Sequence, residues 1–271
     1  MPIGLMLTMT DEDDETRMRR LMKDHYERPL PKRFYKDVSV SADNGILLDG
    51  RPVKTPLKAV LRLPNTGLAA AVAEEWRRQD KIINPGVMPL TKLANTAIDR
   101  VLAANAHVIR ELVDYANADL VCYRAESPLG LMKRQYDMWD PVLAWIAEKL
   151  GVKFIVSTGV MHKPQSTEAL ATFEAYLGAL DRFQLTALYN ISTLIGSALT
   201  ATMLIESAID GGTGWAIAHV DEDYQIEQWG WDLEAQSRRA NRRIEFDASL
   251  RFAELARDKL VFTAQGPLKL V

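Results

Sequence analysis

The sequence is poor in the residues that build disulfide frameworks and metal centres. Cys122 is the single cysteine among 271 residues, which excludes an internal disulfide and suits a reducing compartment. The four histidines lie more than 50 residues apart and form no His-x-x-x-His pair. Clustered ligands at short spacing are what a metal site needs. We therefore expect no metal site, and we expect Cys122 to be a buried structural residue.

Catalytic and cofactor-binding motifs are also missing from the sequence. It contains no Gly-x-Ser-x-Gly elbow, no P-loop and no Gly-x-Gly-x-x-Gly fingerprint. The one glycine cluster, at residues 211–214, lacks the Lys-Ser/Thr pair of a P-loop and follows no predicted strand. It is expected to be a turn between helices. The motif search therefore identifies no catalytic residues and no cofactor-binding residues.

Neither the net charge nor the N-terminus points to nucleic acid or to export. With 33 Lys+Arg against 36 Asp+Glu, the net charge of −3 gives no general attraction to nucleic acid or to an anionic membrane. No basic segment precedes the apolar first ten residues, and an acidic run follows them at once. We expect a cytoplasmic protein whose residues 1–30 form a flexible extension.

One long uncharged stretch raises the question of a membrane span. Residues 183–205 carry no charge over 23 positions, but they include eight serine, threonine, asparagine and glutamine residues. That polar content is too high for hydrocarbon. The stretch is predicted to form one buried central helix of the protein core, without membrane insertion.

The patterning along the chain predicts an α+β fold. Residues 31–90 show alternating strand signals and a hairpin turn at Asp49-Gly50. A helix capped by Asn65 or Thr66 is expected to cover this small antiparallel sheet with Leu68, Val72 and Trp76. Residues 91–271 are predicted to form a larger, mainly helical domain. Its helical segments lie near 90–119, 128–150, 166–181, 184–209, 215–229 and 232–258, and one strand-like run spans 152–158.

Positive charge is absent from a long C-terminal stretch. Residues 183–237 contain no lysine or arginine, yet they carry eight acidic residues. Asp223 and Glu227 lie four apart on a predicted helix, where like charges repel. Three interpretations remain open: pairing with distant arginines, a solvated face without a role, or a docking surface for a basic partner. The arginines considered for the first interpretation are Arg238, Arg239, Arg242 and Arg243.

Three of the six tryptophans border the acidic stretch. Trp215, Trp229 and Trp231 fall within 17 residues. They could pack in the core, or include anchors of a protein interface, where tryptophan is enriched.

Several phrases, taken in order, resemble one family. They are RFYKDVSV, ILLDGRPVKTP, LAAAVAEEW, MPLTKLANTAIDRV, DLVCYRAESP, QYDMWDPVL and DEDYQIEQWG. Together they are similar to the assembly chaperone of the ATP synthase catalytic head, the "ATP-twelve" chaperone family. The resemblance runs from about Arg33 to Trp229 and is strongest in LDGRPVKTP, EEW and the MPLT phrase. Mitochondrial members carry a basic presequence, which this sequence lacks, so a bacterial member is expected.

The resemblance implies a function in protein binding. In that family the protein binds the alpha subunit of the catalytic head before it pairs with beta, and so prevents aggregation. It implies a β-rich N-terminal domain, a helical C-terminal domain, no catalysis and no cofactor. Acidic positions in the C-terminal domain matter for function, and the matching segment here assigns partner binding to Glu222, Glu227 and Trp229.

Two alternatives come from other classes of protein. One is a small-molecule hydrolase that uses paired carboxylates within residues 221–232, which would have to converge at roughly 5–9 Å in a cleft. The other is a permanent structural subunit of a complex. The oligomeric state, the affinity, the release mechanism and the client face that is covered do not follow from the sequence.

Overall fold

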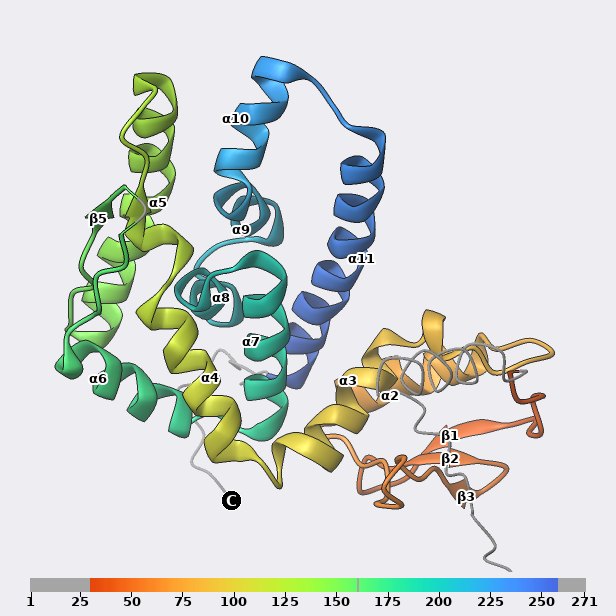
Figure 1. The fold of residues 1–271 in the computed structure, drawn as a ribbon. Coiled ribbons are helices and arrows are strands. Elements are labelled where there is room, and N and C mark those ends of the chain that lie inside the picture. Colours follow the sequence, from red (N-terminus) through yellow and green to blue (C-terminus); the bar gives the residue numbers. More distant parts are fainter. Residues whose placement is uncertain (1–29, 160, 258–271) are drawn as a thin grey trace, which may run out of the picture.

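The computed structural model describes residues 30–159 and 161–257 (Figure 1). Within them, a small antiparallel sheet and helix α2 (Thr66–Arg77) lie to one side of a larger group of helices. The fold class is α+β, as the sequence predicts. The predicted flexible extension 1–30 falls, apart from Leu30, outside the described residues.

The sheet is a three-stranded meander in chain order. Its strands are β1 (Val38–Val40), β2 (Ile46–Leu48) and β3 (Arg51–Pro52). The predicted hairpin turn is confirmed, because Leu48 pairs with Arg51 and both turn residues, Asp49 and Gly50, have positive φ, 48° and 75°. Two positive φ values in a two-residue loop match the twist of the flanking strands. The Asp49 carboxylate also accepts the backbone N–H groups of residues 36 and 37, which fixes the approach to β1.

Helix α2 closes the sheet on one face. The Asn65 side chain accepts the N–H of Leu68 at 2.9 Å, which confirms the predicted cap. Leu68 and Val72 are fully buried, and Trp76 is half-buried. The Asn65 amide also donates to the carbonyl of Leu255 at 2.9 Å. The start of α2 is therefore tied to the end of the last helix in the described chain.

The rest of the described chain is mainly helical. Short connecting elements are η1 (Pro85–Val87), the π-helical η2 (Ala97–Val101) and η3 (Leu120–Cys122). The longer helices are α3 (Pro89–Thr96), α4 (Asn105–Asn117), α5 (Leu129–Leu150), α6 (Thr167–Gly178), α7 (Arg182–Ile195), α8 (Ala198–Ile205), α9 (Gly211–Ala218), α10 (Val220–Trp229) and α11 (Leu233–Ala256). The strand predicted at 152–158 is shorter than expected: only β5 (Ser157–Thr158) forms, parallel to β4 (Tyr123–Arg124).

The structure contradicts the prediction of one continuous helix over residues 183–205, because two helices form there. It confirms the predicted burial of this stretch. Gly196 adopts φ 71° and ends α7, and the Ser197 hydroxyl then caps α8 by accepting the N–H of Thr200. The buried Asp119 carboxylate accepts the N–H of Leu199 at 3.0 Å and so supports the same break. All eight residues of α8 are buried. Among the described residues, no helix is both long and apolar enough to cross a bilayer.

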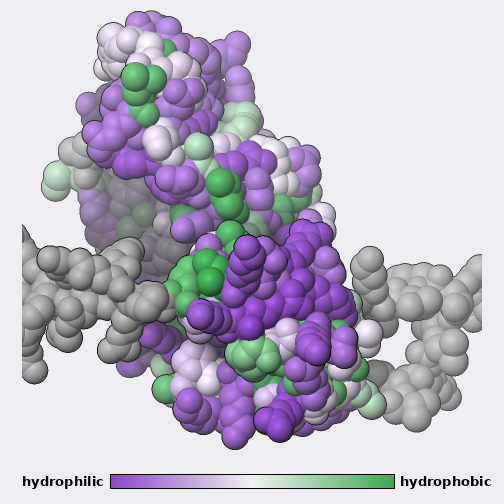
Figure 2. Space-filling model, turned by 90° about the vertical axis from the view of Figure 1, so that its right-hand side faces the viewer, coloured by the Kyte–Doolittle hydropathy of each residue, from purple (hydrophilic) through white to green (hydrophobic). Residues whose placement is uncertain are grey.

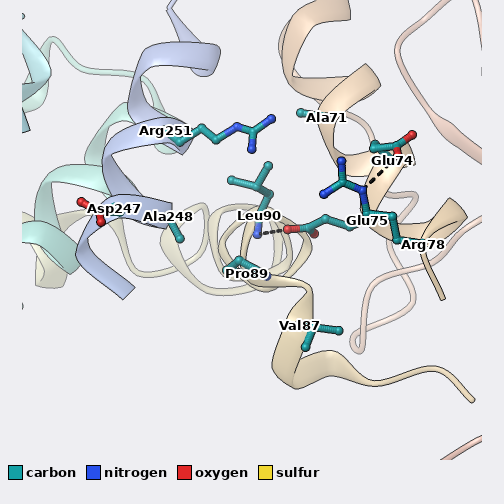
Figure 3. A pocket seen from close by; sticks show the side chains of 10 residues that line it. All are labelled: Ala71, Glu74, Glu75, Arg78, Val87, Pro89, Leu90, Asp247, Ala248 and Arg251. Carbon is teal, nitrogen blue, oxygen red and sulfur yellow. Dashed lines mark hydrogen bonds and ion pairs between the residues drawn. The ribbon is translucent and has the colours of Figure 1, made fainter. Parts of the chain in front are cut away.

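A carboxylate from α2 positions the start of α3. Figure 3 shows Glu75 of α2 reaching the Leu90 backbone, with Arg251 of α11 across the same pocket. Glu75 accepts the N–H groups of Leu90 and Thr91, both at 2.8 Å, and the Thr91 hydroxyl at 2.7 Å. Burial raises the pKa of Glu75, and these hydrogen bonds oppose that shift. Met88 precedes Pro89 at the start of α3, and its side chain makes no capping hydrogen bond. Glu75 therefore supplies the acceptor for the first free backbone N–H groups of α3.

Candidate protein-binding surface

The three predicted partner-binding residues lie together on α10. Val220 is the one residue of this helix that is buried, so α10 sits on the surface of the helical part. Glu222 lies in the first turn of α10 together with Asp221 and Asp223. The positive end of the helix dipole favours negative charge there. Trp229 ends the helix and is 79% exposed.

Glu227 is held by an arginine from α5. Its two carboxylate oxygens each accept a hydrogen bond from Arg134, both at 2.8 Å, in a bidentate pair. Arg134 holds the pKa of Glu227 below its usual range. The same guanidinium lies over the ring of Tyr224, 5.5 Å from its centre. Glu227 is thus oriented within the fold while its side chain stays half-exposed.

Glu222 and Asp223 face the opposite helix, α11. Arg239 lies 2.6 Å from Asp223 and 3.9 Å from Glu222. His219 Nε2 is 3.8 Å from Glu222 as well, but burial lowers the pKa of His219, so this contact is no ion pair at neutral pH. The His219 ring instead stacks on Trp215 at 4.0 Å. Glu222 therefore makes only long contacts to charged groups, and its side chain is 37% exposed.

Pairing of the acidic stretch with the arginines that the sequence singles out is confirmed for two of the four, Arg239 with Asp223 and Arg238 with Glu234. Arg243 pairs with Asp247, and Arg242 donates to a backbone carbonyl of α7. Arg134 was missed, because it lies 93 residues from Glu227 and no local pattern joins the two. Only the packing of α5 against α10 brings them together.

Each of the two repelling carboxylates pairs with an arginine of a different helix. Glu227 pairs with Arg134 on α5, and Asp223 pairs with Arg239 on α11. These pairings offset the repulsion expected between like charges four residues apart. In the described part of the chain, no group of three or more histidine, cysteine or acidic side chains is arranged to hold a metal ion.

The three tryptophans divide between core and surface. Trp215 is 7% exposed, whereas Trp229 and Trp231 are 79% and 52% exposed. Leu233 follows at the start of α11 and is 81% exposed. The C-terminal end of α10 and the start of α11 lie at one extremity of the helical part (Figure 1). We call the set Glu222, Glu227, Trp229, Trp231 and Leu233 the α10 surface.

Apolar side chains are dispersed over the face that Figure 2 shows. Figure 2 shows a face that is mostly hydrophilic, with its hydrophobic residues in small separate patches. Tryptophan is enriched at protein interfaces, and the α10 surface exposes two tryptophans, Trp229 and Trp231.

Comparison with known proteins gives consistent matches. The family model described as ATP12 chaperone protein matches residues 32–147, a stretch that ends before α10. The crystal structure of Atp12 from Paracoccus denitrificans is 38% identical, with a TM-score of 0.79; the match covers 84% of this chain and 99% of that one. A mutant of P. denitrificans Atp12p, with lysine in place of an aspartate, is 39% identical, with a TM-score of 0.80 and coverage of 84% and 98%. The Atu1473 protein from Agrobacterium tumefaciens is 41% identical, with a TM-score of 0.80 and coverage of 92% and 93%.

Proposed function

This chain belongs to the ATP12 chaperone family, and on that premise we propose that it binds the unassembled alpha subunit of the ATP synthase catalytic head. It protects that subunit until beta pairs with it. Its role in ATP synthase assembly is that of a chaperone, exerted by binding rather than by catalysis. It acts in the cytoplasm of a bacterium and needs no cofactor.

The exposed indole of Trp229 is the observation that carries this proposal. A tryptophan that is 79% exposed leaves a large apolar surface in water. Tryptophan is among the residues that most often dominate the energy of a protein interface. At the end of a surface helix that two arginines hold in place, Trp229 is available to a partner without unfolding of the chain.

The acidic residues around Trp229 suit a client that must be released. An unpartnered alpha subunit exposes the faces that it normally buries against beta, and such patches aggregate. A chaperone that covers them needs a moderate, partly polar interface rather than a permanent apolar one. Glu222 and Glu227 steer and orient a basic region of the client, an effect that acts mainly on the association rate and its salt dependence.

The test compares three variants of the α10 surface with two matched controls. Trp229→Ala, Glu222→Lys and Glu227→Lys are each assayed for binding to purified alpha subunit and for melting temperature. Phe34→Ala removes an aromatic ring that is 74% exposed on the sheet side, and Glu174→Lys reverses an exposed acid on α6. The controls should bind as the wild type does.

The expected losses differ between the two kinds of residue. Trp229→Ala should weaken binding about thirtyfold, which corresponds to roughly 2 kcal/mol. The two charge reversals should slow association, most strongly at low salt. If all three variants fold and bind as the wild type does, the docking surface lies elsewhere. If melting temperature falls while the affinity of the folded protein is unchanged, the three residues have a structural role.

A further inference from the structure

A second cavity lies far along the chain from α10, where the sheet part meets the first helices of the helical part. It has a volume of about 390 Å³ and lies between the turn at residues 55–58 and the helical run of α3 and η2. The turn contributes two apolar residues, and the helical run contributes polar and charged ones. The lining residues are Pro56, Leu57, Lys92, Asn95, Thr96, Asp99 and Arg100.

Asp99 fixes the shape of this cavity. One carboxylate oxygen accepts the Thr55 hydroxyl at 2.6 Å, and the other accepts the N–H of Leu57 at 2.9 Å. Lys58 completes the turn with φ 73°, and its N–H donates to the carbonyl of Thr55. The backbone of Leu57 is therefore held in place while its side chain is 70% exposed. A backbone that is already ordered loses little freedom when a partner covers the residue, which favours binding.

The helical wall of the cavity carries positive charge. Lys92, Thr96 and Arg100 recur at four-residue spacing, so they share one face of the run. Within residues 30–159 and 161–257, neither Lys92 nor Arg100 forms an ion pair. Asp99 is the acidic residue of the lining, and the turn already occupies both of its oxygens. The cavity is thus a cationic site next to an apolar surface.

Asn95 adds an unsatisfied polar group to the same wall. Its Oδ1 is buried and accepts no hydrogen bond from the described residues. A buried acceptor without a donor costs free energy and requires an explanation, such as a partner group. The wall continues into η2, a π-helical turn, and such turns occur frequently at functional sites.

We propose that this cavity is a second protein-binding site, which takes an acidic segment of a partner chain. A glutamate or aspartate carboxylate of that segment binds between Lys92 and Arg100, and a neighbouring apolar side chain covers Leu57. The site is opposite in charge to the α10 surface, so the two sites select different segments.

A protein segment fits this cavity better than nucleic acid does. Its lining offers two cations and no aromatic ring on which a base could stack. Nucleic-acid sites instead combine extended positive surfaces with many phosphate contacts. The protein as a whole carries a net charge of −3.

The experiment uses three short peptides and the full chain, and it does not depend on the identity of the client. The probes are blocked pentapeptides of the sequences Glu-Leu-Glu-Leu-Glu, Gln-Leu-Gln-Leu-Gln and Glu-Ser-Glu-Ser-Glu. Each is titrated into isotope-labelled protein, and NMR shift changes are followed at the backbone of Leu57 and Arg100 and at the Asn95 amide. A short single-stranded oligonucleotide is the competing probe.

The acidic leucine peptide should give saturable shifts at these three residues. The glutamine and serine peptides should bind at least tenfold more weakly, as should the variant Arg100→Glu. Lys92→Glu serves as a second variant if Arg100→Glu does not fold, and Lys81→Glu, an exposed lysine outside the cavity, should bind normally. The proposal is overturned if the shifts fail to saturate, if they scatter over other lysines, if the glutamine peptide binds equally, or if the oligonucleotide binds these residues more tightly.

Discussion

Trp229 and Trp215 form a matched pair that separates binding from folding. Trp229 is 79% exposed, so about 200 Å² of a side chain of about 250 Å² is left for a partner to cover. At about 25 cal/mol per Å² the gross gain is about 5 kcal/mol, and the costs of ordering an interface reduce it. We therefore expect Trp229→Ala to weaken alpha-subunit binding by at least about 2 kcal/mol. Its effect on stability should stay within about 0.5 kcal/mol.

Trp215 gives the opposite expectation. It is 7% exposed, stacks on His219 at 4.0 Å and packs against Phe246 at 5.2 Å between ring centres. Removing a buried tryptophan side chain costs about 3–5 kcal/mol of unfolding free energy. For a chain of this size that lowers the melting temperature by about 6–20 °C.

Both variants are measured by thermal unfolding and by binding to immobilised alpha subunit at a temperature where each is folded. The reasoning is refuted if Trp229→Ala melts as low as Trp215→Ala. It is equally refuted if Trp229→Ala retains wild-type affinity.

Three further expectations concern stability. Ile195→Ala and Leu199→Ala, at positions that are 3% and 0% exposed, should each cost about 2–5 kcal/mol in urea denaturation; wild-type midpoints for both would contradict the burial. Burial raises the pKa of Asp119 to about 6, above its usual value of 3.8, so this group costs stability as pH rises from 4 to 7. The unfolding free energy of the wild type relative to Asp119→Asn should fall by about 2 kcal/mol over that range, and parallel pH profiles would contradict this. Glu75→Ala leaves the first N–H groups of α3 unsatisfied and should cost about 1–3 kcal/mol by calorimetry, whereas an unchanged transition would refute the capping role.

Features coded over a few residues could be predicted from the sequence. The Asp49-Gly50 hairpin and the Asn65 cap depend on backbone preferences of neighbouring residues, and both are confirmed. The break at Gly196 was missed because apolar periodicity continues across it. A glycine alone does not reveal that the following serine caps a new helix and that Asp119, 80 residues from Leu199, supports it.

The α10 surface could be predicted in part. The absence of lysine and arginine over residues 183–237 indicated that this acidic segment is unusual. The arginines that pair with its acidic residues lie outside it in the chain. Arg134 reaches Glu227 from α5, and this contact depends on tertiary packing alone. Trp215 lies in an apolar segment, GWAIA, and Trp229 follows a polar one, QIEQ, yet the sequence left open for both whether they pack in the core or anchor an interface; the structure buries Trp215 and exposes Trp229.

The phrases that carry the family resemblance contact one another. Glu75 of the EEW phrase caps the helix that begins in the MPLT phrase. Thr55 of the VKTP phrase donates to Asp99 of the IDRV phrase. These contacts explain the resemblance as a set of structural constraints on the sheet side. The division into domains at 31–90 and 91–271 stays a prediction, since α3 packs against both α2 and α11.

The most direct test of the chaperone account measures protection and release of the alpha subunit. Purified alpha subunit is incubated with the wild type, Trp229→Ala or Phe34→Ala while aggregation is followed by light scattering, and beta subunit is then added. The account predicts that the wild type and Phe34→Ala keep alpha in solution and are displaced by beta, whereas Trp229→Ala protects poorly. Aggregation of alpha at the same rate with and without the wild-type protein would contradict it, and so would a complex that beta cannot displace.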